Sequence, residues 1–235
     1  KAVATLVLRP TARQSVEQVQ TTRTKLVVGM LDNVKGAAKV FTHGPKGWTA
    51  TSLDLPANSS IGLGSSDDKG ERLFITVTGY LTPTTYWLAD AGSLKLEQVK
   101  ASPARFDAST HVVEQFEATS TDGTKVPYFV VRPKDVKYDG SAPTLLYAYG
   151  GFQVPLTPGY SGVMGKLWLE RGGVYVVANI RGGGEFGPAW HEAGLKANRQ
   201  KVYDDFFAVS QDLITRKITS PRRLGIMGGS NGGLL

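Results

Sequence analysis

Three apolar runs in the second half of the 235-residue chain each end at two or more glycines. Runs of this kind predict strands of a sheet that is buried on both faces. They lie at Thr144–Tyr149, Val174–Ile180 and Arg223–Met227. Between the last two runs, Val202–Lys217 carries apolar residues at helical spacing, with Asp204 and Asp205 expected in its first turn. The order of strand, strand, helix and strand predicts an α/β domain.

A β-hairpin is expected to open this domain. Val112–Ser120 and Thr124–Arg132 read as strands, and Asp122-Gly123 lies between them. This dipeptide favours a tight hairpin turn because both of its residues tolerate positive φ. We therefore expect antiparallel strands first and parallel strands after them, in a domain that spans residues 106–235.

Residues 1–105 show a different pattern: short segments in which apolar and polar residues often alternate, divided by glycine, proline, asparagine and aspartate. The predicted strands are Lys25–Leu31, Ala38–Thr42, Trp48–Leu53, Arg72–Thr78, Thr84–Ala89 and Leu94–Val99. Residues 26–31 and 38–42 resemble residues 73–78 and 85–89 at an offset of 47. Propeller blades repeat at about 40–50 residues. Blades of a β-propeller are the prediction, and an ordinary β-sandwich is the alternative.

Composition removes several classes of function. The chain has no cysteine, which excludes disulfides, thiol nucleophiles and cysteine metal sites within it. The net charge is +7, but no lysine or arginine cluster forms a nucleic-acid footprint. No apolar run reaches the length of a membrane span, and no secretory signal is visible. The missing cysteines fit a reducing cytoplasm, our first expectation, or a bacterial periplasm as the alternative.

Ser230 is the strongest candidate for a catalytic residue. Gly228-Gly-Ser-Asn-Gly232 matches G-x-S-x-G directly after a predicted strand. In that context the glycines permit a sharp strand-to-helix turn that exposes the serine hydroxyl. The backbone N–H of Asn231 would then stabilise an oxyanion, with a second donor from the loop after an earlier strand, where Tyr149-Gly-Gly-Phe152 lies. Taken by itself, Tyr149 is better explained as a core aromatic at a strand end.

The base that a serine nucleophile requires is not evident. In this class of fold the acid and the histidine follow the serine, but His43, His111 and His191 all precede it. Only five residues follow Ser230. A serine without its base is a weak nucleophile, so we expect the chain as printed to be inactive by itself.

Several further motifs carry a family resemblance. They are Asp122-Gly-Thr-Lys125, Tyr147-Ala-Tyr-Gly-Gly-Phe152, Asn179-Ile-Arg-Gly-Gly-Gly-Glu-Phe-Gly187, Trp190-His191, Asp204-Asp-Phe206, Thr219-Ser-Pro221 and, as an extension of the serine motif, Gly228-Gly-Ser-Asn-Gly-Gly-Leu-Leu235. In this order and spacing, residues 112–235 resemble the prolyl oligopeptidase family of serine peptidases. Residues 1–105 are similar to it only loosely.

The resemblance implies an architecture. Residues 1–105 would be the last blades of a seven-bladed propeller, and residues 106–235 the N-terminal half of an α/β-hydrolase domain that stops after the nucleophile elbow. The rest of the propeller and an N-terminal extension would precede Lys1.

The resemblance also assigns roles. Ser230 would be the nucleophile, Asn231 the backbone oxyanion donor and Tyr149 the side-chain oxyanion donor, while Phe152 would line the pocket for the proline ring. The Asp and His of the triad would lie beyond Leu235. No cofactor and no metal are implied. The substrates would be short peptides cleaved on the C-terminal side of proline, and the full-length enzyme is expected to be a monomer with no nucleic-acid or membrane partner.

Two departures bear on specificity. Gln153–Pro158 and Ala148 differ from the family's usual residues beside the substrate pocket, so serine hydrolysis is better supported than strict proline preference. A related oligopeptidase, an acylaminoacyl-peptidase or an esterase-like hydrolase is therefore the alternative. Asn231 favours the prolyl branch, because the branch that cleaves after basic residues usually carries alanine there and dipeptidyl-peptidase-like relatives carry tyrosine.

Two alternative functions from other classes of protein remain open. Gly182–Gly187 satisfies G-x-G-x-x-G after a strand, with Asp204 about 20 residues on, as in dinucleotide-binding proteins. Pro188 and Trp190 crowd the expected pyrophosphate position, and Asp204 begins a helix rather than ending a second strand. The other reading is a non-catalytic binding module, a propeller with half a hydrolase domain that only holds a partner.

Overall fold

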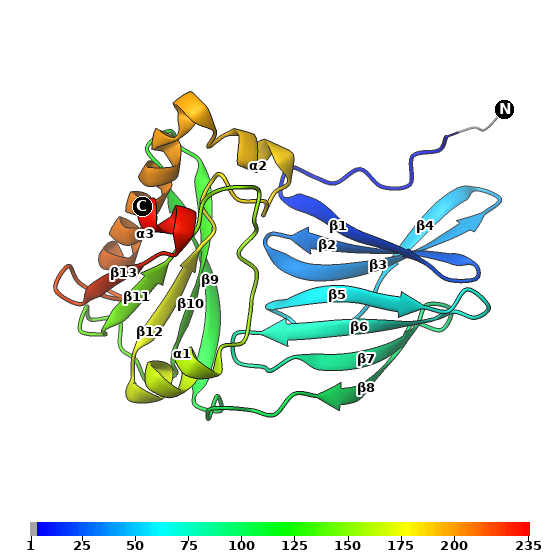
Figure 1. Ribbon diagram of the computed structural model, residues 1–235, viewed down its shortest axis with the longest axis horizontal. Coiled ribbons are helices and arrows are strands. Elements are labelled where there is room, and N and C mark those ends of the chain that lie inside the picture. Colours follow the sequence, from blue (N-terminus) through cyan, green and yellow to red (C-terminus); the bar gives the residue numbers. More distant parts are fainter. Residues whose placement is uncertain (1–3) are drawn as a thin grey trace.

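The computed structural model describes residues 4–235 and contains three sheets (Figure 1). Two four-stranded antiparallel sheets lie beside each other, and a five-stranded mixed sheet with helices lies next to both. The first sheet contains β1 (Gln14–Thr21), β2 (Lys25–Asp32), β3 (Lys35–Gly44) and β4 (Gly47–Ser52). The second contains β5 (Ser59–Ser66), β6 (Arg72–Gly79), β7 (Thr85–Asp90) and β8 (Lys95–Ala101).

Each four-stranded sheet is an up-and-down meander in which strands pair only with their neighbours in sequence. This is the pattern of a propeller blade, whereas a β-sandwich of immunoglobulin type exchanges strands between its sheets. The 47-residue repeat aligns β2 and β3 with β6 and β7, the corresponding strands of the two blades. The predicted repeat is therefore confirmed, and the propeller prediction is favoured over the sandwich.

The two blades share one hydrophobic core. Leu73, Ile75 and Val77 alternate on the buried face of β6 and pack with residues of both sheets, Val27 and Val40 among them. The blades approach closely at Gly36, where an added Cβ would lie 2.7 Å from the backbone nitrogen of Ile61. A larger residue at position 36 would push the sheets apart.

The five-stranded sheet has the order β13-β11-β12-β10-β9. Its strands are β9 (His111–Thr119), β10 (Lys125–Pro133), β11 (Thr144–Tyr147), β12 (Val174–Ala178) and β13 (Leu224–Met227). β9, β10 and β12 are antiparallel neighbours, while β12, β11 and β13 run parallel. The expected change from an antiparallel hairpin to parallel strands is confirmed. The short helices are α1 (Gly162–Leu167), α2 (Pro188–Glu192), η1 (Leu169–Arg171), η2 (Lys196–Asn198) and η3 (Ser230–Leu234).

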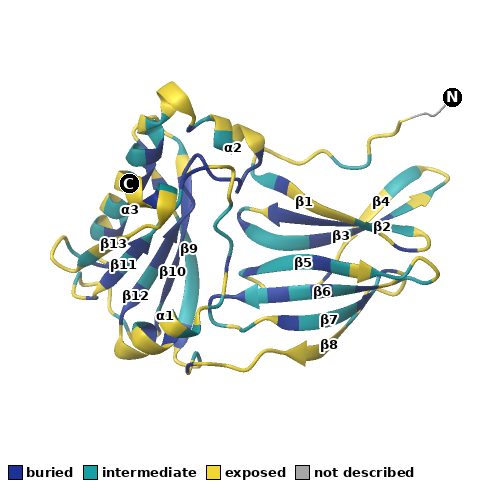
Figure 2. Ribbon diagram, in the orientation of Figure 1, coloured by how far each residue is buried: buried dark blue, intermediate teal, exposed yellow. Residues whose placement is uncertain are grey.

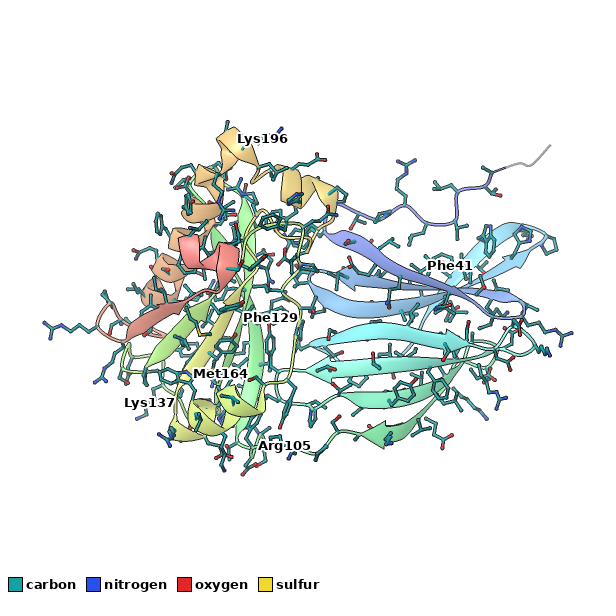
Figure 3. All side chains as sticks on the ribbon, in the orientation of Figure 1. Phe41, Arg105, Phe129, Lys137, Met164 and Lys196 are labelled. Carbon is teal, nitrogen blue, oxygen red and sulfur yellow. The ribbon has the colours of Figure 1, made fainter. Side chains whose placement is uncertain are left out.

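The one long helix of the described residues, α3 (Gln200–Thr215), packs on β9 and β10. Val202 and Leu213 of α3 are fully buried against Tyr128 and Val130 of β10. The opposite face of β10 carries Phe129 (Figure 3). The centre of its ring lies 5.5 Å from that of Tyr80 in the second blade. The central strands are thus buried on both faces, by α3 on one side and by loops and blades on the other (Figure 2).

Polar contacts also join the first blade to β9. Arg13 forms an ion pair with Glu117 of β9, and its Nη2 donates a hydrogen bond to Asn33 Oδ1 at 2.5 Å. The Arg13 guanidinium lies 4.7 Å from the centre of the Phe186 ring. The blades and the five-stranded sheet therefore meet through apolar and charged contacts together.

Two local predictions were wrong, the burial of β13 and the first turn of the long helix. β13 is not buried: it pairs only with β11 at the sheet edge, and Ile226 is 62% exposed because no described element covers it. α3 begins at Gln200, so Asp204 and Asp205 lie in its second turn and do not serve the helix N-terminus. The predicted hairpin turn at Asp122-Gly123 is confirmed, with a three-residue loop in which Gly123 has positive φ (+86°).

Asp205 is instead one half of a buried ion pair. Arg181 follows β12, and its side chain is 4% exposed. Its Nη2 lies 2.6 Å from Asp205 Oδ1, and its Nε and its backbone nitrogen each lie 2.9 Å from Asp205 Oδ2. Nη1 lies 2.5 Å from Asp122 Oδ2 in the hairpin turn. One arginine thus joins the end of β12, helix α3 and the β9–β10 turn.

The two acidic partners differ in exposure. Asp205 is fully buried, whereas the Asp122 side chain is 38% exposed. Hydrogen bonding from the Arg181 guanidinium holds the pKa of Asp122 well below its usual range. Solvent screens the contact between Arg181 and Asp122, so Asp205 contributes more than Asp122 to compensating the buried charge of Arg181.

No helix within residues 4–235 combines the length and the apolar character needed to span a bilayer. In the same residues, no three histidine or acidic side chains are grouped as metal ligands would be.

The buried ion pair generates the first prediction. Asp205→Ala leaves the Arg181 charge buried without its main partner, and the free energy of unfolding should fall by about 3–5 kcal/mol. Asp122→Ala removes a partly exposed partner of the same arginine and should cost less than about 1 kcal/mol. Urea unfolding of both variants measures the two changes. Equal effects of the two substitutions would contradict this division.

Candidate active site

Ser230 is the first residue of η3 and lies in the sharp turn that follows β13. Its φ is +50°, a left-handed conformation that a non-glycine residue seldom adopts. A Cβ at position 228 would collide with the Gly232 carbonyl, and one at position 232 would collide with the Ala148 carbonyl. The glycines on both sides of the serine are therefore required sterically, and the serine is exposed in a strained strand-to-helix turn.

The loop after β11 lies directly beside this turn. Asn231 donates a hydrogen bond from Nδ2 to the Tyr149 carbonyl at 2.6 Å. Gly151 packs so closely on the Asn231 side chain that it has no room for a Cβ. Since β11 and β13 are neighbouring parallel strands, their carboxyl ends bring Tyr149 and Ser230 to the same edge of the sheet.

The structure therefore brings all four predicted site residues together. Ser230 and Asn231 lie on the turn after β13, and Tyr149 and Phe152 lie on the loop after β11. Tyr149 is half-buried, whereas Phe152 is 74% exposed, an unusual position for a phenylalanine. The catalytic and substrate-binding roles of these residues stay predictions.

The loop that carries Tyr149 and Phe152 is irregular. Gly150, Phe152 and Gln153 have φ values of +62°, +53° and +56°. Arg199 Nη1 donates to the Gly150 carbonyl at 2.7 Å, and Gln153 N donates to the Gly182 carbonyl at 3.1 Å. The Asn231 side chain and Arg199, which both hydrogen-bond to this loop, were not predicted from the sequence. No periodic pattern marks either residue.

The histidines are engaged elsewhere. His191 Nδ1 lies 2.7 Å from the Gly182 carbonyl and 3.1 Å from Gln153 N, so it contacts the Tyr149–Gln153 loop rather than Ser230. His111 is buried with Nε2 3.0 Å from the Leu169 carbonyl, and His43 packs edge-on against Trp48 in the first blade. Within residues 4–235 no histidine or carboxylate hydrogen-bonds to Ser230, and the position of its base stays a prediction.

The glycines of Gly182–Gly187 are used for packing. A Cβ at position 182 would collide with the Gly150 carbonyl, and one at position 184 would collide with the Gln153 carbonyl. These glycines thus contact the loop after β11 rather than an open phosphate site. The geometry speaks against the dinucleotide-binding reading of this segment.

Glu185 in the same segment is buried, with 1% exposure. Its Oε1 accepts hydrogen bonds from Leu156 N at 2.9 Å and from Asn179 Nδ2 at 3.2 Å. Its Oε2 has no hydrogen-bond partner among the described residues. Burial raises the pKa of Glu185 to about 7, and the negative charge of Glu17 on β1 acts in the same direction. Tyr80 of the second blade is the other buried titratable group that interacts with it.

This pKa generates the second prediction. The folded protein keeps the Glu185 proton up to about pH 7, while the unfolded chain releases it near 4.5. Stability should therefore fall as the pH rises between these values, by up to about 3 kcal/mol. Glu185→Gln should remove this decline, whereas the exposed Glu192→Gln should keep it. Unfolding free energies at pH 5 and pH 8 give the comparison, and identical declines in all three proteins would refute it.

Comparisons with known proteins agree with this architecture. The model of the prolyl oligopeptidase N-terminal β-propeller domain matches residues 3–102, and the model of the prolyl oligopeptidase family matches residues 160–235. An uncharacterized peptidase of Sinorhizobium fredii is 58% identical over 226 residues, covering 96% of this chain and 31% of the relative. A prolyl endopeptidase of Elizabethkingia miricola is 39% identical over 183 residues, covering 78% of this chain and 26% of the relative.

Solved structures show the same likeness. The structure of a post-proline cleaving enzyme from Rickettsia typhi superposes with a TM-score of 0.84 at 44% identity, covering 96% of this chain and 33% of that one. The chain spans about a third of the length of the curated relatives it matches. Its fold is the β-propeller of these enzymes together with the start of their peptidase domain. The chain belongs to the prolyl oligopeptidase family.

Proposed function

We propose that the full-length protein containing this chain is a serine endopeptidase that cleaves short peptides on the C-terminal side of proline. The observation that carries the proposal is Ser230, held at φ +50° in a glycine-flanked turn at the carboxyl end of a parallel strand. A left-handed serine in this place is the geometry of a nucleophile elbow. A turn with only a structural role would favour glycine at this position instead.

The proposed reaction is acyl transfer. The Ser230 hydroxyl attacks the carbonyl carbon after proline and passes its proton to a histidine, which we expect outside residues 1–235. The Asn231 N–H and the Tyr149 hydroxyl stabilise the oxyanion of the tetrahedral intermediate. The intermediate collapses when the histidine gives its proton to the leaving amine. Water then hydrolyses the acyl-enzyme.

Proline preference rests on Phe152 and on the relatives. An aromatic ring that is 74% exposed, on the loop that contacts the Ser230 turn, offers an apolar surface to a proline ring. Relatives named prolyl endopeptidase and a structural neighbour described as a post-proline cleaving enzyme support the same preference. Because Gln153–Pro158 departs from the family's usual residues, an oligopeptidase or esterase-like hydrolase without strict proline preference is the second candidate.

The two parts of the chain would divide the work. We assign residues 1–105 to the propeller, which would limit access to short peptides, and residues 106–235 to the peptidase domain. The assigned boundary falls in the connection between β8, which ends at Ala101, and β9, which begins at His111. A non-catalytic module that only binds a partner would share this division but would not turn over substrate.

Cleavage assays on the full-length reading frame test the reaction and its specificity together. Peptides that differ only in proline, alanine or arginine before the scissile bond should be cleaved fastest with proline. Ser230→Ala should abolish cleavage of all three, to at least about 10³-fold below the parent enzyme, because the nucleophile is lost. Equal rates with all three residues would favour the second candidate, and no cleavage of any peptide by the folded parent enzyme would favour the binding module.

Tyr149→Phe tests the oxyanion role. Removing one oxyanion donor typically lowers kcat on the order of 10²–10³-fold with little change in substrate binding. We expect a loss of this size in kcat and a KM within about threefold of the parent value. Tyr147→Phe, in the strand just before the loop, is the matched control and should keep its activity. A kcat within about twofold of the parent in Tyr149→Phe would show that the hydroxyl is not a donor.

A further inference from the structure

The loop after β11 has a conformation that its own sequence does not favour. Phe152 and Gln153 are both left-handed, which is sterically unfavourable for residues with a Cβ. Two adjacent residues in this region persist only when surrounding contacts hold them. Because the loop carries Tyr149 and Phe152, the contacts that hold it also decide where these two proposed site residues lie.

Arg199 is the one described arginine or lysine whose side chain donates a hydrogen bond to this loop's backbone; the Glu185 and His191 side chains lie within hydrogen-bond distance of Leu156 N and Gln153 N of the same loop. Arg199 immediately precedes α3, 49 residues further along the chain, and its Nη1 donates to the Gly150 carbonyl at 2.7 Å. A hydrogen bond from a guanidinium is stronger and shorter than one between neutral groups. Arg199 itself is only partly exposed, so solvent screens this contact less than it would at an open surface.

A contact with Tyr203 of α3 orients the Arg199 guanidinium toward Gly150. The central carbon of the guanidinium lies 5.2 Å from the centre of the Tyr203 ring, one turn further along the helix. Arg199 Nη2 is buried and has no hydrogen-bond partner among the described residues. Buried donors are usually paired, so this unpaired nitrogen is a cost of the position that the side chain takes. The other terminal nitrogen, Nη1, is the one that reaches the Gly150 carbonyl.

The Gly150 carbonyl is fixed from a second direction as well. The Gly182 Cα packs so tightly against this oxygen that a side chain at position 182 would collide with it. Since the peptide group is planar, fixing the carbonyl fixes the whole Gly150–Gly151 peptide. This peptide follows Tyr149 and leads into the left-handed residues Phe152 and Gln153. The direction of Tyr149 relative to Ser230 therefore depends on how Gly150 is held.

We infer that Arg199 is a positioning residue of the active site, which acts through the Gly150 carbonyl to keep Tyr149 and Phe152 in their places beside Ser230. The inference rests on the proposed function, because it gives Arg199 its role through the oxyanion donor. Arg199 takes no part in bond making or proton transfer. Its removal lets the loop relax and moves the oxyanion donor away from the reacting carbonyl.

The test uses the full-length enzyme and three variants. Arg199→Met removes the donor and keeps most of the apolar side chain, Arg199→Lys keeps a positive donor, and Lys201→Met removes a charge from the same helix without a contact to the loop. A displacement of about 1 Å in a positioned group can cost about 10²-fold in rate. We expect Arg199→Met to lower kcat about 10–100-fold with a smaller change in KM, Arg199→Lys to recover part of the loss, and Lys201→Met to match the parent.

A double-mutant cycle with Tyr149→Phe identifies the route of the effect. If Arg199 acts through Tyr149, Arg199→Met should cost less than about threefold in kcat when the Tyr149 hydroxyl is already absent. A purely structural role would instead multiply the two losses. The inference would be overturned if the loss in kcat of the double variant equalled the product of the two single losses, or if Arg199→Met had the same kcat as Lys201→Met.

Hydrogen exchange provides a readout that does not need activity. Arg199→Met should speed amide exchange in peptides covering residues 149–154, while Lys201→Met should leave it at the parent rate. Unchanged exchange in Arg199→Met would overturn the inference even if activity fell. If the parent enzyme cleaves no peptide but exchange rises as expected, the proposed function fails and the hold of Arg199 on the loop stands. If Arg199→Met does not fold, Arg199→Lys is compared with Lys201→Met instead, by kcat and by amide exchange of residues 149–154.

Discussion

The buried pair of Arg181 and Asp205 is the interaction on which the arrangement of the peptidase part depends. It joins three elements that are distant in sequence: the end of β12, helix α3 and, through Asp122, the β9–β10 turn. Such a pair adds little net stability compared with well-packed apolar residues, but leaving one charge alone is costly. The pair therefore selects one register of α3 against the sheet. That register places Arg199, just before α3, against the Gly150 carbonyl.

Close backbone packing then builds the candidate site. The segment after β12 touches the loop after β11 at Gly182 and Gly184, and the turn after β13 touches the same loop at Gly151 and Gly232. A methyl group at any of these positions would collide with a neighbouring backbone or side chain. The glycine-rich motifs are explained here by three loops that meet at the carboxyl ends of parallel strands. Strained residues at Ser230, Phe152 and Gln153 persist because this packing and its hydrogen bonds leave little room to relax.

The sequence predicted the strands with strong apolar patterns and the one long helix, because burial imposes a period on them. It missed β1 and β5, since β1 is mostly polar and exposed and β5 is rich in serine and glycine. It placed Asp205 in the first turn of the helix, whereas α3 begins five residues earlier, at Gln200. It also missed the partner of Asp205, because sequence spacing cannot reveal a contact with Arg181, 24 residues away. The turn at Ser230 was predictable, since its glycines follow from sterics alone. The supports from Arg199 and the Asn231 side chain were not, because they join irregular loops that leave no periodic signal.

The central claim is that Ser230 is a nucleophile rather than a residue of a structural turn. Fluorophosphonate probes react covalently with activated serines, and peptide mapping of the labelled full-length protein locates the adduct. The account predicts one adduct, on the peptide that contains Ser230, and none on folded Ser230→Ala. An unlabelled parent protein with intact unfolding behaviour, or equal labelling of the parent and Ser230→Ala, would contradict it.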